Sequence, residues 1–321
     1  MSTKKPSFLT GPIQRPPDMS VFKPASPVER RTTPCREEFE REYLAGRGKP
    51  VVLTDAAANW SALKKWSFDF FSENYGNLDI VAINRLFRPS VGRRVKLADF
   101  MTYCQFPAAS SFKRNPDEPP FYFNFKPFSK HPELLDDFAQ PSVVDNFYDQ
   151  FTGELQKWYL DHFSYLFIGP PGTLTPLHVD LLGTHAWLSQ IAGRKHFVLF
   201  GPEDHHNVYG GQASLVNPDF EAMPLLRNAQ PYEAIVHPGE VVFFPGGWYH
   251  HVVAMDPSIT LTFNFVNKTN FALHLLEICR DLPRWVKRID VPEFRRRAGI
   301  TWGPQDFEVS PQSTASVAAG G

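Results

Sequence analysis

Two residues that can bind a metal ion lie close together in the segment TPLHVDLLGTHAW, residues 175–187. His178 and Asp180 are two positions apart, so on a β-strand both side chains project from one face, about 7 Å apart along the chain. The later segment PGGWYHHVV supplies His250 and His251, either of which can add a third ligand. Two histidines and a carboxylate form the facial triad of non-haem Fe(II) oxygenases, but similar ligand sets bind zinc in hydrolases. These residues therefore predict a metal centre and leave the metal open.

Polar residues within apolar runs add to this pattern. Lys195 begins the run KHFVLF, where a lysine either extends its ammonium group to water or holds an anionic ligand. Thr175 and Asn264 are small polar residues among apolar neighbours, and buried groups of this kind are usually hydrogen-bonded. His185 is out of phase with the metal-binding face, so it belongs either to the core or to a pocket wall.

The elements that must position these residues change in character along the chain. CREEFEREYLAG and WSFDFFSENYG predict helices, whereas KPVVLTDA, LDIVAIN and FYFNF predict strands. From residue 163 onwards, short apolar or alternating runs are separated by Gly, Pro and Asn, which is typical of a sandwich or barrel. FALHLLEICRDL is amphipathic and predicts a further helix. We therefore expect one α+β domain, mainly β.

The ends of the chain differ in composition from this domain. Residues 1–34 are rich in Pro, Ser, Thr and charge and predict an extended arm, and residues 303–321 form a low-complexity tail that we expect to be disordered. The folded domain is therefore predicted to span residues 35–302.

Composition restricts the class of protein. The chain has 321 residues, of which 42% are hydrophobic and 21% charged, as in globular proteins. A formal net charge of −1 gives no general attraction to nucleic acid or to an anionic membrane, so neither partner is expected. Three scattered cysteines without a CxxC pair do not form a disulfide framework. With no apolar signal-peptide core and no apolar run long enough to span a membrane, we expect an intracellular protein, cytoplasmic or nuclear.

Three blocks, in this order along the chain, resemble a known family. They are GPPGTLTPLHVDLLGTHAWLSQIAGRKHFVLF, HPGEVVFFPGGWYHHVV and SITLTFNFVN. They are similar to the jumonji C (JmjC) family of Fe(II)- and 2-oxoglutarate-dependent oxygenases, in particular its cupin-like, hydroxylase-type members. The resemblance extends over residues 36–280. It implies a double-stranded β-helix, the jelly-roll core of cupins, with flanking helices.

Residue by residue, the resemblance also implies a complete site. The iron ligands would be His178, Asp180 and His250. The resemblance selects His250 because the family places its ligand at the first histidine after the Gly-Trp pair and one aromatic residue. The residues that would bind 2-oxoglutarate are Lys195, Thr175, Tyr122, Asn264 and Thr262. Among these, Lys195, Thr175 and the more loosely aligned Tyr122 would hold the distal carboxylate.

The activity implied by the resemblance is hydroxylation with Fe(II), 2-oxoglutarate and O₂. The expected substrate is an amino-acid side chain in a protein or peptide, and 2-oxoglutarate would be decarboxylated to succinate. Removal of an N-methyl group and hydroxylation of a small molecule or a tRNA base stay open, as does a homodimer. Two other classes are also kept: a non-enzymatic cupin-like binding protein, and a zinc- or manganese-dependent hydrolase or isomerase that uses the same ligands.

Overall fold

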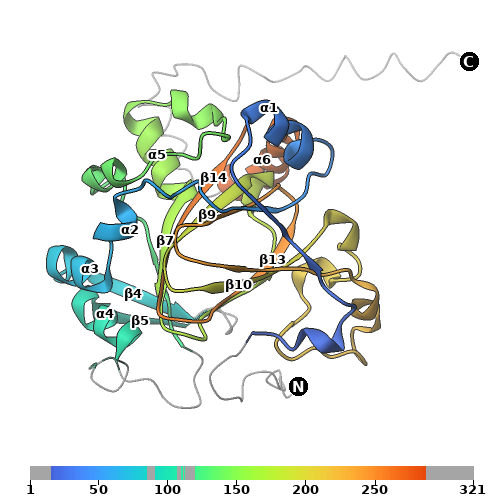
Figure 1. Ribbon diagram of the computed structural model, residues 1–321, viewed down its shortest axis with the longest axis horizontal. Helices are drawn as coiled ribbons and strands as arrows, with labels where there is room; N and C mark the ends of the chain where they lie inside the picture. Colours follow the sequence, from blue (N-terminus) through green and yellow to red (C-terminus); the bar gives the residue numbers. More distant parts are fainter. Residues whose placement is uncertain (1–15, 85–90, 107–109, 111, 113–119, 287–321) are drawn as a thin grey trace, which may run out of the picture. The chain divides into compact units, whose positions relative to one another are not determined.

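Two β-sheets form the core of the protein in the computed structural model, which describes all residues except 1–15, 85–90, 107–109, 111, 113–119 and 287–321. One sheet contains β1 (Ser26–Pro27), β8 (Leu174–His178), β10 (Lys195–Phe200), β11 (Tyr232–Val236) and β13 (Tyr249–Ala254). The other contains β2 (Glu29–Arg31), β3 (Val51–Leu53), β6 (Phe123–Phe125), β7 (Ser164–Gly169), β9 (His185–Ala192), β12 (Val241–Phe244) and β14 (Ser258–Phe265). Figure 1 shows the central strands of both sheets.

The connections between the sheets make this core a jelly roll. The strand order is β1-β11-β10-β13-β8 in one sheet and β2-β3-β12-β9-β14-β7-β6 in the other. The strands from β7 to β14 are divided equally between the sheets, and every pairing among them is antiparallel. This is the predicted double-stranded β-helix, so the expected fold class, α+β and mainly β with flanking helices, is confirmed.

Apolar side chains from both sheets meet between them and form a buried core. Phe197, Leu199 and Val252 from one sheet pack in one buried cluster with Leu188 and Phe244 from the other. Each large apolar side chain buried in this way stabilises the fold by about 1.5–3 kcal/mol. Leu188, Phe244 and Val252 of this cluster also line a cavity between polar residues, so the core supports the wall of that cavity.

Strand β14 explains why part of the interior is polar. All residues of this strand, SITLTFNF, are buried, because both of its faces are covered. Its polar residues alternate with apolar ones, and side chains alternate between the faces of a strand. Thr262 and Asn264 face the interior, where they line a cavity, while Phe263 packs outside, stacked on Trp187 at a centroid distance of 5.1 Å. The interior of the jelly roll is therefore polar along part of this strand.

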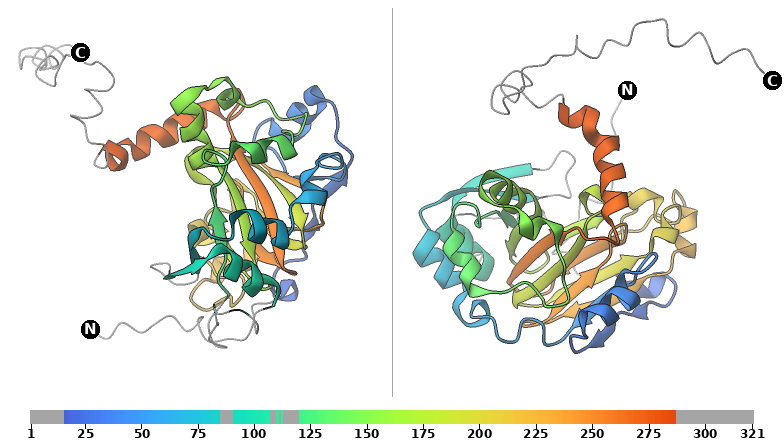
Figure 2. Two further views of the ribbon diagram at one scale, coloured as in Figure 1. Left: turned by 90° about the vertical axis from the view of Figure 1, so that its left-hand side faces the viewer. Right: turned by 90° about the horizontal axis from the view of Figure 1, so that it is seen from above.

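Helices pack on the seven-stranded sheet, and a small sheet adjoins its β6 edge, where Ile83 and Tyr122 form an antiparallel bridge. These elements are α2 (Ala62–Lys65), α3 (Phe68–Tyr75), α4 (Leu97–Gln105) and the hairpin of β4 (Asp79–Asn84) and β5 (Val91–Lys96), which lie near one another in Figures 1 and 2. Trp60 contacts Trp187 of β9 edge to face at 5.9 Å. The buried carboxylate of Asp137 accepts hydrogen bonds from Trp66 and Lys65. These bonds join the end of α2 to the 3-10 helix Pro132–Asp137.

The remaining helices are α1 (Arg36–Phe39), which continues as a π-helix over Glu40–Leu44, α5 (Gly153–Phe163) and α6 (Phe271–Val286). The chain divides into two compact units, residues 1–274 and 275–321. None of the helices in the described part of the chain has the length and hydrophobicity needed to cross a membrane.

Most of the predicted elements are present. The helices predicted at residues 35–46 and 66–76 correspond to α1 with its π-helical continuation and to α3, and the three predicted N-terminal strands correspond to β3, β4 and β6. Residues 26–31 of the predicted arm form β1 and β2, which pair in parallel with β11 and β3. The sequence did not indicate α4, α5 or β5, and the predicted tail lies outside the described residues.

Candidate metal centre and its pocket

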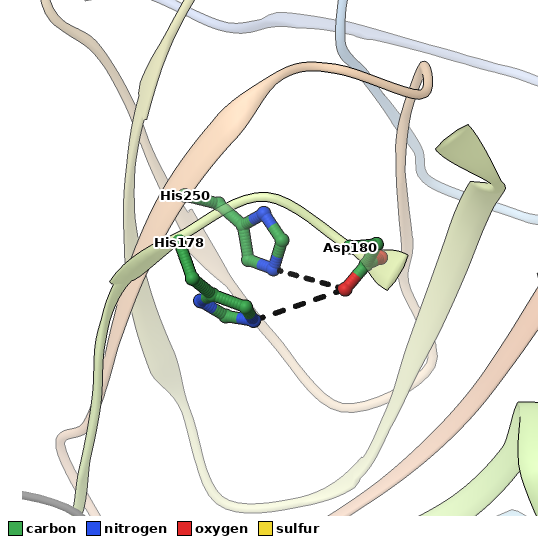
Figure 3. A group of neighbouring side chains, drawn as sticks. All are labelled: His178, Asp180 and His250. Atoms are coloured by element: carbon green, nitrogen blue, oxygen red, sulfur yellow. Dashed lines mark ion pairs between the residues drawn. The ribbon is translucent and has the colours of Figure 1, made fainter. Parts of the chain in front are cut away.

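Three side chains converge in the wall of one cavity. His178 Nε2 lies 3.8 Å from Asp180 Oδ1, and His250 Nε2 lies 3.7 Å from the same oxygen (Figure 3). The two imidazole rings are 4.1 Å apart between centroids. In the part of the chain that the structure describes, this is the group of metal-binding side chains whose ligand atoms all lie within 4.8 Å of one another. The geometry thus brings together the three predicted ligands.

Strand pairing places these side chains. In the register of β8 and β13, His178 lies directly opposite His250, and an irregularity follows between His250 and Val252. Asp180 lies two residues beyond the end of β8, in an extended conformation at the start of the 3-10 turn Leu181–Gly183. Because side chains alternate along a strand, His251 points away from the metal-binding group, and its buried ring has no hydrogen-bond partner among the described residues.

Both histidines present the same ring nitrogen toward the centre. His178 Nδ1 lies 2.8 Å from the carbonyl oxygen of Pro176, and His250 Nδ1 lies 3.3 Å from that of Trp248. A carbonyl only accepts hydrogen bonds, so in each ring Nδ1 donates a proton to it and Nε2 is the nitrogen presented to a metal. Burial, and then the neighbouring His178, holds the pKa of His250 well below its ordinary value, which keeps this imidazole neutral.

The carboxylate of Asp180 is oriented by a neighbour on β14. Asn264 donates from its amide nitrogen to Asp180 Oδ2 at 2.8 Å and to the hydroxyl oxygen of Thr184 at 3.0 Å. Thr184 in turn donates to the carbonyl oxygen of Leu181 at 2.9 Å. These bonds hold Oδ2 and leave Oδ1 facing the two histidines. Thr184 was not predicted from the sequence, although it lies only four residues after Asp180.

A cavity of about 360 Å³ is lined by the three ligands and by most of the other predicted site residues. Besides the ligands, its lining includes Lys195, Thr175, Thr262 and Asn264. Tyr122 lines a smaller adjoining cavity together with Lys195, Thr175, Thr173 and Ser258. The structure thus places all the predicted site residues in the walls of these two adjoining cavities.

Lys195 is the cation of this cavity. Only 8% of the residue is exposed, and its Nζ lies 5.5 Å from the centre of the Phe167 ring. No carboxylate of the described residues forms an ion pair with it, and burial lowers its pKa from 10.5 to about 7. A buried ammonium group without a counter-ion is costly, so the site fits a ligand that brings a carboxylate.

The cavity wall also contains residues that the sequence did not single out. Asn124, His162 and Tyr165 line one side, and Val179 and Leu181 flank the ligand Asp180 on the other. Leu181 is 72% exposed and Val179 37%, so apolar surface is open to solvent directly beside the ligand Asp180. Val179 and Leu181 could have been predicted as wall residues because each is adjacent in the sequence to Asp180.

Two further histidines are not part of the cavity lining. His185 is buried and accepts a hydrogen bond from the backbone N–H of Gly246 at 2.9 Å, so it belongs to the core and not to the pocket wall. His205 lies with its Nδ1 2.6 Å from the hydroxyl of Tyr249.

Comparison with known proteins agrees with this geometry. A family model described as a cupin-like domain matches residues 36–271, which is well over half of the chain. The chain belongs to the cupin-like domain family. As predicted, it is of the JmjC type, since several similar proteins are named as JmjC demethylases or oxygenases.

Three of these relatives show the range of names within the family. The cupin-like domain is 32% identical over 270 residues to "Lysine-specific demethylase JMJ21" of Arabidopsis thaliana, an alignment that covers 79% of this chain and 26% of the relative. It is 26% identical to "Bifunctional arginine demethylase and lysyl-hydroxylase psr-1" of Caenorhabditis elegans, covering 79% of this chain and 65% of the relative. It is 30% identical to "2-oxoglutarate and iron-dependent oxygenase JMJD4" of Gallus gallus, covering 41% and 34%. In each case the chain spans less than two thirds of the relative.

The residues of the cupin-like domain fit Fe(II) and 2-oxoglutarate. Two imidazoles and one carboxylate supply the ligand atoms of the facial triad, which leaves coordination positions open for a cosubstrate. The uncompensated ammonium group of Lys195 lies in the wall of the cavity that these ligands also line. A bidentate 2-oxo acid with a second carboxylate matches this combination of a metal site and a cation.

Proposed function

We propose that the protein is an Fe(II)- and 2-oxoglutarate-dependent dioxygenase that hydroxylates an amino-acid side chain of a protein or peptide. The observation that carries this proposal is the placement of buried Lys195, without an ion-pair partner among the described carboxylates, in the same cavity as His178, Asp180 and His250. A hydrolase or isomerase with the same three ligands has no need of a buried cation that awaits an anion.

Each residue has a definite task in this proposal. His178, Asp180 and His250 would hold Fe(II). Backbone carbonyls fix the Nδ1 atoms of the two histidines, and Asn264 fixes Oδ2 of Asp180. The ammonium group of Lys195 would pair with the distal carboxylate of 2-oxoglutarate, and hydroxyl donors beside it, from Thr175 and Tyr122, would complete that contact. Binding at both ends orders the cosubstrate before the side chain that is to be oxidised enters the site.

The reaction balances with one molecule each of 2-oxoglutarate and O₂. Bound Fe(II) would supply activation of O₂ coupled to oxidative decarboxylation of the 2-oxo acid. One oxygen atom ends in succinate, CO₂ leaves, and the second oxygen atom replaces a C–H bond of the substrate by C–OH. The chain's part is to orient the target carbon and to exclude water, for which the deep, partly apolar cavity is suited.

A protein or peptide substrate is supported by the mouth of the cavity and by the relatives. Val179 and Leu181 expose apolar surface immediately beside Asp180, where a polypeptide could cover it. Two of the relatives named above are described as a lysine demethylase and as an arginine demethylase with lysyl-hydroxylase activity. The same two observations favour a second candidate, oxidation of an N-methyl group, in which the hydroxylated carbon leaves as formaldehyde.

The test is succinate release from 2-oxoglutarate by iron-loaded protein exposed to O₂, with and without a peptide library, beside a His178→Ala variant. Mass spectrometry of the peptides separates the two reactions, because hydroxylation adds one oxygen atom and demethylation removes a CH₂ group and yields formaldehyde. Succinate production that requires His178 is the expected result. No turnover above that of the variant, with peptides present, would contradict the oxygenase and favour a binding protein or a zinc enzyme.

A further inference from the structure

The two turns that carry the metal-binding residues touch each other. The turn Leu181–Gly183 follows Asp180, and the loop that contains Gly246 leads into β13 and His250. A Cβ atom at Gly246 would collide with the carbonyl oxygen of Gly183 and would lie 3.1 Å from that of Thr184. The position of one ligand-bearing turn therefore limits the position of the other.

His185 connects the second of these turns to the chain beyond β14. The backbone N–H of Gly246 donates to His185 Nδ1 at 2.9 Å, and His185 Nε2 lies 2.9 Å from the hydroxyl oxygen of Thr269. Thr269 donates this hydroxyl to Asn267 Oδ1 at 2.7 Å. Every role is fixed, because an amide N–H can only donate: Nδ1 must accept, so the ring proton is on Nε2 and points to Thr269. Burial lowers the pKa of His185 to about 3, which keeps the ring neutral.

The same segment also holds the first turn. Asn270 donates from its amide nitrogen to the carbonyl oxygen of Gly183 at 3.0 Å. His274 Nδ1 lies 2.7 Å from the carbonyl oxygen of Leu182, so it donates to that carbonyl. These bonds hold Leu182 in a left-handed conformation with φ 58°, which a leucine rarely adopts without such support. Segment 267–274 thus fixes the turn after Asp180 directly and the turn before His250 through His185.

We propose that His185 is a positioning residue for the metal centre, which couples the His250 turn to the segment that also fixes the Asp180 turn. His185 does not belong to the group of metal-binding side chains, so its action is on the separation of the ligands and not on the metal. The role rests on the proposed metal site. It explains why a histidine stands at the first position of β9: both ring nitrogens are needed, one to accept and one to donate.

Binding of Co²⁺ to the metal-free full chain tests this role without depending on turnover. Affinity is measured by calorimetry, ligand geometry by the visible absorption of bound Co²⁺, and stability by thermal unfolding of the metal-free protein. His185→Phe keeps the ring and removes both hydrogen bonds, and we expect its Co²⁺ affinity to fall about 10- to 100-fold with a changed absorption spectrum, as for loss of other residues that orient metal ligands.

Two conservative variants separate the two hydrogen bonds. In His185→Asn the amide oxygen takes the place of Nδ1 and can accept from Gly246, so most of the Co²⁺ affinity should return. In His185→Gln the amide nitrogen takes the place of Nε2 and reaches only Thr269, so this variant should behave like His185→Phe. The matched control is His196→Phe, another buried histidine, whose ring lies by Glu233 on the face of β10 opposite to Lys195. It should lose stability and keep the wild-type affinity and spectrum.

Wild-type affinity and spectrum in His185→Phe would overturn the positioning role, as would an equal loss of affinity in His196→Phe. If His185→Phe does not fold, Thr269→Val provides the test, because it keeps the side-chain volume and removes the hydroxyl that receives the ring proton. Its affinity should fall several-fold, and an unchanged affinity would overturn the role. A wild-type protein that binds no Co²⁺, or a His178→Ala variant that binds it equally well, would instead overturn the ligand set and both proposals with it.

Discussion

Replacement of Lys195 by methionine should make the ligand-free protein more stable while weakening binding of 2-oxoglutarate. Methionine keeps the apolar stem beside Phe167 and removes the ammonium group. In the folded protein burial lowers the pKa of Lys195 from 10.5 to about 7, whereas the unfolded chain keeps the ordinary value. At about 1.4 kcal/mol for each pH unit between these two values, the buried lysine costs up to about 5 kcal/mol below pH 7.

The pH dependence gives the sign of the effect. Between pH 7 and 10.5 the unfolded chain binds the proton of this lysine and the folded protein does not, so wild-type stability rises with pH. Below pH 7 both states bind the proton and the full cost is present. The stability advantage of Lys195→Met should therefore be about 5 kcal/mol near pH 6 and only about 1 kcal/mol near pH 9.5.

Urea unfolding of both proteins at these two pH values measures the difference. Lys64→Met, which replaces an exposed lysine, is the control and should change stability little at either pH. With Mn²⁺ present, excess 2-oxoglutarate should stabilise the wild type and not Lys195→Met, because only the lysine pairs with the distal carboxylate. A Lys195→Met variant that is no more stable than the wild type near pH 6, or whose advantage does not change with pH, would refute this reasoning.

Three further predictions follow from other contacts. Asn264→Leu should weaken Co²⁺ binding about 10-fold or more, because Asp180 loses the donor that orients its carboxylate; calorimetry with unchanged affinity would contradict this. Burial alone would raise the pKa of Asp137, but its hydrogen bonds hold that pKa below 3.8. Asp137→Asn should therefore lower the free energy of unfolding by about 1–3 kcal/mol near pH 7, and this difference should disappear as the pH falls below 3.8. Unfolding of both proteins over an acid pH series tests the sign. Trp187→Leu should lower stability by about 2–4 kcal/mol by removing its stacking on Phe263, and an unchanged unfolding midpoint would show that the outer aromatic layer repacks.

Some elements could be predicted because their signals are local. The strands from residue 163 onwards show apolar runs bounded by Gly and Pro, and α3 begins with the side-chain cap of Ser67 and ends at Gly76. Helix α5 was not predicted because its apolar face is narrow: only three of its residues are buried, Tyr159, Leu160 and Phe163. A short apolar face gives a weak period in the sequence, and tertiary packing on β7 and β14 then decides that the segment is helical.

The candidate site divides in the same way. The sequence by itself determined the kinds of ligand, since His178 and Asp180 in an HxD pair and a histidine pair after an apolar strand are a matter of residue type and spacing. The family resemblance chose His250 over His251. Alternation along a strand shows that one of these residues faces inward and the other outward, but which one does so depends on the register of β13 against β8.

Only the tertiary structure decided what surrounds the ligands. It placed Lys195 in the wall of the same cavity, assigned Asn264 to the outer oxygen of Asp180, and turned His185 from a residue of open role into the link between two turns. The two hydrogen bonds among these contacts join residues 61 and 84 positions apart, and no local pattern encodes them. They form when the closure of the two sheets sets the register of strands distant in sequence, because a change of one residue in that register turns every side chain to the other face.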